Sequence, residues 1–256
     1  MNREFRDKNL FDNIAIRYSR KDTVASASLP RINKLMKSID PVICENNSLG
    51  DVIDIGCGIG ATAKHLVGKY NNYLGIDHSK ELIKIATKYN EGVTNATFIC
   101  ANVKSEKLPS NYADTILAIG VLHHMTQLDE IMTALKRIAK PGAVFIAIEP
   151  IDVNPIVQLL RWVRGNVDPS YSEEQHFFSS KELKDLMIKN QLCNISLQYF
   201  GLFSKPFAEV IMYPQFIFKH VSRLFVKIDN IIDKLFPIIL RFTAWDIIVR
   251  AKFPEK

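Results

Sequence analysis

The sequence predicts an α/β fold built around a doubly wound sheet of mostly parallel strands. In the first 150 residues, short apolar runs that suit buried strands alternate with helical patterns. A glycine-rich turn joins the first of these strands directly to the helix that follows it. The composition, 47% hydrophobic and 23% charged, is that of an ordinary globular protein. Strands and helices that alternate in this way favour a sheet with helices on both faces.

The individual elements follow from these runs. Strands are expected at residues 51–55, 73–76, 97–100, 115–119, 143–148, 194–200 and 245–252. Helices are expected at residues 61–70, 79–89, 126–139 and 179–190. Thr126 should begin the third helix and Pro141-Gly142 should end it. Ser179 and Glu182 have the spacing of a capping box at the start of the fourth.

Composition and cysteine spacing exclude several classes of protein. The four cysteines lie far apart and form no Cys-x-x-Cys or Cys/His cluster, so neither a disulfide framework nor a metal site is expected. The N-terminus is charged and no apolar run approaches about 18 residues, so neither a signal peptide nor a spanning helix is expected. These observations predict a cytoplasmic protein.

One motif indicates the kind of ligand that the protein binds. Residues 52–60 read VIDIGCGIG, a buried strand followed by a turn with Gly56, Gly58 and Gly60. Glycines let the backbone approach a ligand closely, and the next helix begins with unpaired N–H groups. The second strand ends at Asp77, where an acid suits hydrogen bonds to ribose hydroxyls. Together these features predict an adenosine-type cofactor.

The glycine spacing and Asp54 narrow the choice of cofactor. The dinucleotide fingerprint is G-x-G-x-x-G, whereas this turn reads G-x-G-x-G with Asp54 two residues before its first glycine. A carboxylate repels a pyrophosphate but attracts the ammonium of an amino-acid tail. S-adenosylmethionine has such a tail and no phosphate, so it is the cofactor that the sequence favours.

Four successive motifs carry a resemblance to a known family: VIDIGCGIG, LGIDHS, ADTILAIGVLHHM and LKRIAKPGAVFIAIEP. Over roughly residues 45–150 the chain resembles the class I S-adenosylmethionine-dependent methyltransferases. FDNIAIRYSRKD, near the N-terminus, is similar to the opening of the ubiquinone/menaquinone-biosynthesis methyltransferases. The resemblance implies a Rossmann-like fold whose last strand is antiparallel, and methyl transfer from S-adenosylmethionine.

The resemblance also implies roles for individual residues. The positions around the methionine half of the cofactor are Asp54, Gly56, Cys57, Gly58 and Gly60, with Tyr18 closing over the tail. The positions around the adenosine half are Asp77 at the ribose, His78 beside the adenine, Asn102 and Val103 in FICANV, and Gly120 after the fourth strand. Asn102 stands where an Asp is common in the family. Cys57 is also explained as a small packing residue, and Tyr18 as an anchor for an N-terminal helix.

His124 is the candidate catalytic residue. His123 and His124 follow the fourth strand, at the edge of the sheet where ligands bind in open α/β folds. A histidine there is placed to act as a general base, and His124 is favoured. A structural role beside the cofactor explains the same position. Glu149 ends the fifth strand at the same edge.

The chain is expected to form one domain of residues 1–256, with a helical segment at 1–45 and a cofactor-binding core at 46–150. Insertions at 151–178 and 201–243 leave the carboxyl ends of strands and should cover the acceptor side of the site. An amphipathic helix is expected within 215–235, and residues 201–256 carry nine Lys and Arg against five Asp and Glu. This helix suits a lid packed on the core, the wall of a pocket for an apolar acceptor, or a peripheral contact with the inner membrane surface.

These inferences predict methyl transfer to a small, apolar or lipid-like acceptor. A nucleic-acid partner is not expected, because the chain shows no appended nucleic-acid module and no N/D-P-P-Y motif of amino-group methylation. An RNA or protein methyltransferase, and a cofactor-binding partner protein without turnover, remain the alternatives.

Overall fold

The computed structural model describes residues 3–167 and 175–255, so part of the expected 151–178 insertion lies outside the described residues. The strands are β1 (Val52–Ile55), β2 (Tyr73–Asp77), β3 (Ala96–Cys100), β4 (Ala113–Ile119), β5 (Ala139–Pro150), β6 (Cys193–Phe200) and β7 (Asp246–Lys252). The helices are α1 (Arg3–Thr23), α2 (Ala25–Asn46), α3 (Ala61–His65), α4 (Lys80–Tyr89), α5 (Leu128–Ile138), α6 (Pro155–Val167), α7 (Ser180–Lys189), α8 (Lys205–Glu209), α9 (Gln215–Leu235) and α10 (Pro237–Thr243), with a 3₁₀ turn at Leu122–His124.

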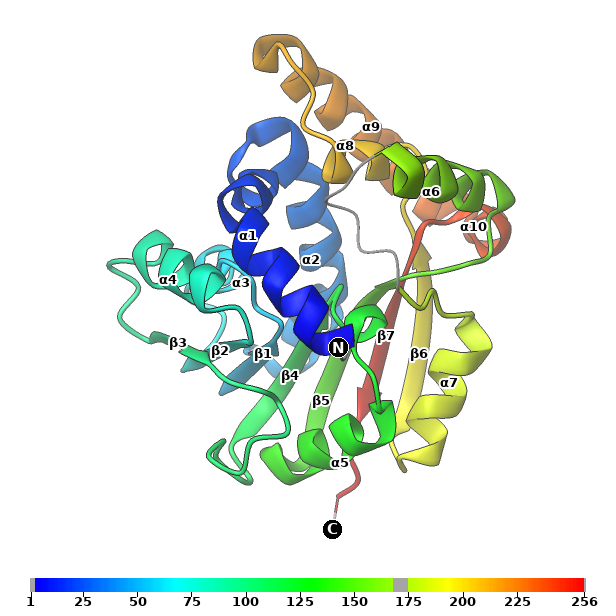
Figure 1. Cartoon of the computed structure of the whole chain (residues 1–256). Coiled ribbons are helices and arrows are strands. Elements are labelled where there is room, and N and C mark those ends of the chain that lie inside the picture. The colour runs from blue at the N-terminus through cyan, green and yellow to red at the C-terminus, as the bar shows by residue number, and fades with distance from the viewer. Residues whose placement is uncertain (1–2, 168–174, 256) are drawn as a thin grey trace.

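The seven strands form one sheet in the order β3-β2-β1-β4-β5-β7-β6 (Figure 1). The first five strands are parallel, whereas β7 runs antiparallel to both β5 and β6. Strand order reverses between β1 and β4, which is where open α/β sheets bind their ligands. The predicted doubly wound, mostly parallel sheet with an antiparallel last strand is confirmed.

Alternate residues of the strands pack against helices on opposite faces. Ile53 and Ile55 of β1 belong to the core beneath α5 and α7. Val52 belongs to the other core, which Leu35 and Ile39 of α2 cover together with α3. Asp54 comes between Ile53 and Ile55 in β1, so it projects to the α2 and α3 face. The sheet alternation therefore places a carboxyl group within an apolar layer.

Three expected boundaries are wrong. The helix after the glycine turn ends at His65 instead of residue 70, because the N–H of Leu66 already bonds to Ala63 and the chain turns toward Gly68 at φ +80°. Helix α5 begins at Leu128, two residues after Thr126, because Gln127 takes a left-handed conformation. Strand β5 begins at Ala139, and Pro141-Gly142 lies inside it. An irregularity in the β4–β5 register accommodates the Pro-Gly pair.

The segments outside the sheet gather at its carboxyl edge. Helices α1 and α2 precede β1, α6 follows β5, and α8 to α10 separate β6 from β7. Figure 1 shows α6 and α8 to α10 above the carboxyl ends of the parallel strands, whereas α2 also reaches down along one face of the sheet. Helix α2 packs along α9 and α8, so the start of the chain and the second insertion form a continuous layer.

Candidate functional site

The turn after β1 requires glycine at two positions. Gly56 and Gly60 have φ values of +66° and +67°. A Cβ at Gly56 would lie 2.3 Å from Cγ2 of Val121, and one at Gly60 would lie 2.4 Å from Cε1 of Phe98. A larger residue would therefore suffer both backbone strain and steric overlap. Gly60 lines neither of the pockets beside the turn, so its role here is to let the turn pack on β3.

Two pockets adjoin at this turn. Tyr18, Gly56, Gly58 and Ile119 line both of them. We call them the His78 pocket and the Asp54 pocket, after the side chain that distinguishes each. A Cβ at Gly58 would meet only Cε1 of Tyr18, at 3.9 Å, so the backbone here borders open space. The shared residues make the two pockets parts of one elongated site.

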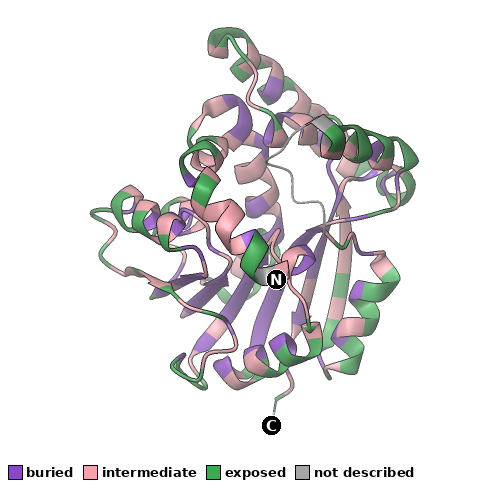
Figure 2. Cartoon of the chain, in the orientation of Figure 1, coloured by how far each residue is buried: buried purple, intermediate pink, exposed green. Residues whose placement is uncertain are grey.

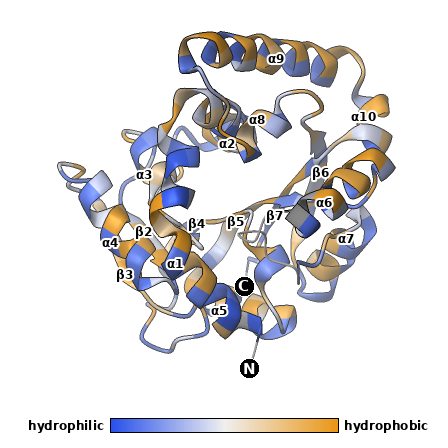
Figure 3. Cartoon of the chain, turned by 45° about the horizontal axis from the view of Figure 1, so that its top comes forward, coloured by the Kyte–Doolittle hydropathy of each residue, from blue (hydrophilic) through white to orange (hydrophobic). Residues whose placement is uncertain are grey.

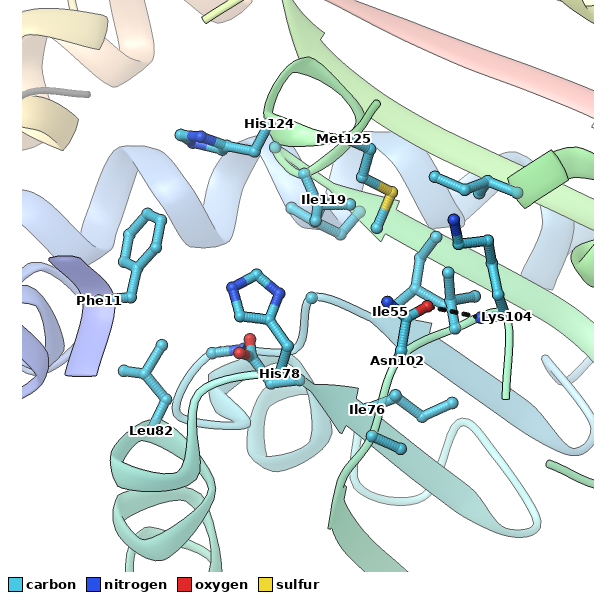
Figure 4. Close-up of a pocket in the computed structure, with 18 of the residues that line it drawn as sticks. Phe11, Ile55, Ile76, His78, Leu82, Asn102, Lys104, Ile119, His124 and Met125 are labelled. Atoms are coloured by element: carbon cyan, nitrogen blue, oxygen red, sulfur yellow. Dashed lines mark hydrogen bonds between the residues drawn. The ribbon is translucent and has the colours of Figure 1, made fainter. Parts of the chain in front are cut away.

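Besides the shared Tyr18, Gly56 and Gly58, the His78 pocket contains six residues that the sequence singled out: Asp77, His78, Asn102, Val103, Gly120 and His124. Figure 4 shows the His78 ring at the centre of the close-up, with Phe11 and Leu82 on one side and Asn102 on the other. The Nε2 atom of His78 is buried and has no hydrogen-bond partner among the described residues. A buried polar atom without a partner is costly unless a ligand satisfies it.

Asp77 lies where β2 ends, against the glycine turn. Its Oδ2 accepts a hydrogen bond of 3.0 Å from the N–H of Gly58, and its Oδ1 accepts one of 2.9 Å from the N–H of Ser79. Burial raises the pKa of Asp77, although these two N–H groups oppose the shift. Each carboxylate oxygen keeps a further lone pair, which leaves Asp77 able to accept from hydroxyl groups. Asn102 already accepts a 2.8 Å bond from the N–H of Lys104.

The Asp54 pocket is built around an almost fully buried carboxyl group. Asp54 is 1% exposed; its Oδ2 accepts a hydrogen bond from the hydroxyl of Tyr73, and its Oδ1 has no partner among the described residues. Burial raises the pKa of Asp54 to about 7, against the opposing effect of the Tyr73 hydrogen bond. A half-satisfied buried carboxyl group suits a cationic ligand, because an opposite charge favours its ionised form.

Arg31 lines the same pocket, and sequence reasoning missed it. Its Nε donates a 2.6 Å hydrogen bond to Oδ1 of Asp22, and its guanidinium carbon lies 5.8 Å from the centroid of the Tyr18 ring. Burial disfavours the charged guanidinium, but Asp22 outweighs this effect and the pKa of Arg31 is raised. Two carboxyl groups, Asp54 and the Asp22 that pairs with Arg31, thus border one pocket with a guanidinium, and this set of charges suits the zwitterionic end of an amino acid. No sequence motif links Arg31 to Asp54, since α2 brings them together only in the folded chain.

His124 points toward the His78 pocket from the turn after β4. Its Nδ1 lies 3.3 Å from Oδ2 of Asp7, and its ring stands edge-on to Phe11 with centroids 5.3 Å apart. Burial, together with the neighbouring His123, lowers the pKa of His124 to about 4, so the imidazole is neutral at pH 7. A neutral imidazole can accept a proton, although a pKa of about 4 makes it a weak base.

Glu149 fixes the turn that carries the two histidines. It is fully buried and accepts hydrogen bonds from the N–H groups of Val121, Leu122 and His123, at 3.1, 2.8 and 3.3 Å. Its Oε2 also lies 2.7 Å from Nδ1 of His123. Burial raises the pKa of Glu149 to about 7. Glu149 is therefore a positioning residue, and its oxygens face the turn.

Cys57 lines the Asp54 pocket and is buried. Burial and the nearby Asp77 and Asp54 raise the pKa of its thiol well above the usual value, so it is protonated and unreactive at pH 7. Among residues 3–167 and 175–255, no three His, Cys, Asp or Glu side chains come together in a group that could hold a metal ion.

Comparisons with known proteins match the central part of the chain to a family model. Residues 53–147 match the model of the methyltransferase domain. The sterol 24-C-methyltransferase of Aspergillus fumigatus is 32% identical over 99 residues, which cover 37% of this chain and 26% of that protein. The uncharacterized methyltransferase YcgJ of Bacillus subtilis is 28% identical over 161 residues, 58% of this chain and 62% of that protein. The matches thus span less than two thirds of either relative.

A solved structure extends the likeness of the fold to nearly the whole chain. The S-adenosylmethionine-dependent methyltransferase from Thermotoga maritima has a TM-score of 0.64 at 17% identity, covering 96% of this chain and 99% of that one. The glycine turn, the sheet order and the family model together define the class. Residues 53–147 carry a methyltransferase domain, and the fold around them is that of an S-adenosylmethionine-dependent methyltransferase.

Proposed function

We propose that the protein binds S-adenosylmethionine across its two adjoining pockets and transfers the methyl group to a small, apolar or lipid-like acceptor. The observation that carries this proposal is the pair of buried polar atoms without partners among the described residues. Oδ1 of Asp54 faces one pocket and Nε2 of His78 the other. They lie on either side of a turn whose glycines leave room for a ligand.

The residues present fit the cofactor at both ends. Asp54 and Arg31 would hold the ammonium and the carboxylate of the methionine half, with Tyr18 and the backbone of Gly58 along it. Asp77 would accept from the ribose hydroxyls, while His78, Asn102 and Val103 border the adenine side. When bound, the cofactor supplies an electrophilic methyl group. The chain contributes binding, orientation and exclusion of water, which suit an in-line displacement.

We place His124 at the acceptor side as the candidate base. Phe11 and Asp7 of α1 fix its ring, and burial keeps it neutral. A pKa of about 4 predicts a transfer rate that changes little between pH 6 and pH 8 when the cofactor is saturating. His124→Ala should slow transfer to a hydroxyl acceptor by about 10²-fold. A variant rate close to that of the wild type would make His124 structural.

Two observations favour an apolar acceptor. The insertions that follow β5 and β6 are rich in apolar side chains and lie at the carboxyl edge of the sheet. One relative acts, by its name, on a sterol. We propose that the whole chain works as a single unit, in which residues 1–45, 151–178 and 201–243 cover a core at 46–150.

Calorimetric titration with S-adenosylhomocysteine, with NADH as the control ligand, tests cofactor binding. Binding of the former alone is expected. Asp77→Ala should weaken it by about 1–3 kcal/mol, because the ribose hydroxyls lose their acceptor. Asp185→Ala, an exposed acid on α7, is the matched control and should leave the affinity unchanged. Binding of neither ligand would refute the proposal.

Transfer of a labelled methyl group from S-adenosylmethionine tests the acceptor class. Incubation with a membrane lipid extract should place the label in the organic phase, and incubation with RNA should not label the RNA. Label on RNA would favour the nucleic-acid alternative. Cofactor binding without transfer to any extract would favour a partner protein without turnover.

A further inference from the structure

Helix α9 contacts α2 through polar side chains. Oγ of Ser222 donates a 2.7 Å hydrogen bond to the carbonyl of Ser26 in α2. The amides of Asn230 and Asn33 exchange hydrogen bonds of 3.0 and 3.1 Å. Lys37 of α2 pairs with Asp233. The apolar stripe is therefore not what joins most of this helix to α2.

Asp229 also anchors α9 to the rest of the protein through a polar contact. It is 1% exposed and accepts hydrogen bonds from the N–H groups of Leu202, Phe203 and Ser204, at 3.2, 2.9 and 2.9 Å, in the loop after β6. A buried carboxylate with three backbone donors fixes the rotation of the helix about its axis. Leu224, Ile231 and Leu235 are consequently held away from the core, whereas Phe225 packs on Phe207 and Ile232 packs against the core.

The outward side of α9 carries large apolar side chains. Phe216 is 75% exposed, Leu235 is 60% exposed, and Leu224 and Ile231 are each 56% exposed. Leu224 and Ile231 are seven residues apart, so they lie two turns apart on one side of the helix. A lid packed on the core accounts for Phe225 and Ile232, which pack inward, but not for Leu224, Ile231 and Leu235, which face outward.

Helices α10 and α6 extend the exposed apolar surface. Helix α10 follows α9 after one residue, and Nδ2 of Asn154, just before α6, donates a 2.8 Å hydrogen bond to the carbonyl of Thr243 at the end of α10. Their outward side chains are also apolar: Ile156, Leu159, Leu160, Trp162, Val163, Ile238, Ile239 and Phe242. Figure 2 shows α6 and α10 largely in green, the colour of exposed residues, and α9 in a mixture of green and pink. Figure 3 shows orange on α6 and α10. We call these outward residues of α6, α9 and α10 the apolar face.

The exposed charges of α9 and α10 have one sign. Every exposed charged residue within 215–243, a segment that the structure describes throughout, is basic: Lys219, Arg223, Lys227, Lys234 and Arg241. The two acids of the segment, Asp229 and Asp233, point inward to partners. The basic residues of α9 lie beside its apolar side chains. An amphipathic helix with this division has the pattern of interfacial membrane helices.

We propose that the apolar face binds the surface of a membrane that contains anionic lipid. The apolar side chains would enter the boundary between headgroups and acyl chains, and the five cations would contact anionic headgroups. Among residues 3–167 and 175–255, no helix combines the length and apolarity that crossing a bilayer requires. A second copy of the chain fits this face poorly, because two such surfaces would bring cations against cations without an exposed acid in 215–243.

The proposal that this face binds a membrane depends only on the contacts and charges described above. The further idea that the membrane supplies the methyl acceptor rests on the proposed function. Helices α6 and α8 leave the same strand ends that border the site, so a membrane on this face would lie on the acceptor side. A lipid-like acceptor would then reach the site without crossing bulk water.

Vesicle co-sedimentation tests the proposal. The protein should bind vesicles of phosphatidylcholine and phosphatidylglycerol, more weakly those of phosphatidylcholine alone, and less at high salt. Leu224→Glu with Ile231→Glu should weaken binding at least about tenfold. The matched control is Val67→Glu with Ile188→Glu, at exposed apolar residues outside the face. It should bind as the wild type does.

Three further variants test the contribution of the basic residues of α9 to membrane binding. Lys219→Gln, Arg223→Gln and Lys227→Gln should each weaken binding to anionic vesicles about fivefold and leave binding to phosphatidylcholine alone unchanged. Trp162, on the face, should show a blue shift in fluorescence on binding that Trp162→Phe abolishes. All variants should keep the wild-type affinity for S-adenosylhomocysteine, which separates this test from that of the proposed function.

Two results would overturn the proposal. One is equal sedimentation of the wild type and the Leu224→Glu, Ile231→Glu variant. The other is a concentration-dependent dimer that the same variant disrupts, in a protein that no vesicle sediments at low salt.

Discussion

Protonation of Asp54 should set how tightly the protein holds S-adenosylhomocysteine near neutral pH. Burial raises the pKa of Asp54 to about 7, although Tyr73 donates a hydrogen bond to it. The ammonium of the ligand is attracted by the ionised carboxylate and not by the neutral acid. Lowering the pH from 8 to 6 reduces the ionised fraction about tenfold, which corresponds to a loss of about 1.4 kcal/mol in binding free energy.

Isothermal titration calorimetry at pH 6, 7 and 8 measures this effect. The affinity should fall about tenfold between pH 8 and pH 6. At pH 6, buffers with different ionisation enthalpies should reveal the release of about one proton on binding, because the ligand drives Asp54 to its ionised form. Titration of the ligand's own amine has the opposite sign, since that amine becomes more fully charged as the pH falls.

Asp54→Asn provides the control. The amide keeps the shape of the side chain but does not titrate, so the variant should bind weakly at pH 8 and change little down to pH 6. A wild-type affinity that stays constant from pH 6 to pH 8 would refute the reasoning. An Asp54→Asn variant with the full pH dependence would assign that dependence to another group.

Two further predictions concern stability. Gly56→Ala should lower the free energy of unfolding by about 2–4 kcal/mol in urea denaturation, because the left-handed backbone is strained and the new methyl group meets Val121. Gly58→Ala should lower it by less, because its methyl group meets only Tyr18, at 3.9 Å. Equal losses in the two variants would contradict the steric argument. Glu149→Gln should cost about 1–3 kcal/mol at pH 8, because an amide N–H₂ would face backbone donors. The difference from the wild type should grow at pH 5, because the raised pKa of Glu149 lets the folded chain bind a proton that the unfolded chain does not, and this stabilises the wild type as the pH falls below about 7. A loss independent of pH would contradict the raised pKa.

Sequence patterns predicted the parts of the structure that are determined by residues close together in the chain. The VIDIGCGIG and LGID segments mark the ends of two neighbouring parallel strands. They therefore predicted that Asp77 and the glycine turn lie at one edge of the sheet. Such patterns could not predict how α9 is rotated about its axis. Periodicity identifies an apolar side of a helix, but contacts with Ser26 and Asn33, almost 200 residues away, decide which side faces the protein. Arg31 was missed for the same reason.

The position of β7 has a consequence for how the chain folds during synthesis. This strand, Asp246–Lys252, lies between β5 and β6, although both precede it along the chain. Until residue 252 has left the ribosome, β6 has no neighbour in the sheet and β5 has an open edge. Apolar helices α9 and α10 emerge before this closure. We therefore expect the nascent chain to need chaperone protection late in translation, and a chain truncated before residue 246 to aggregate.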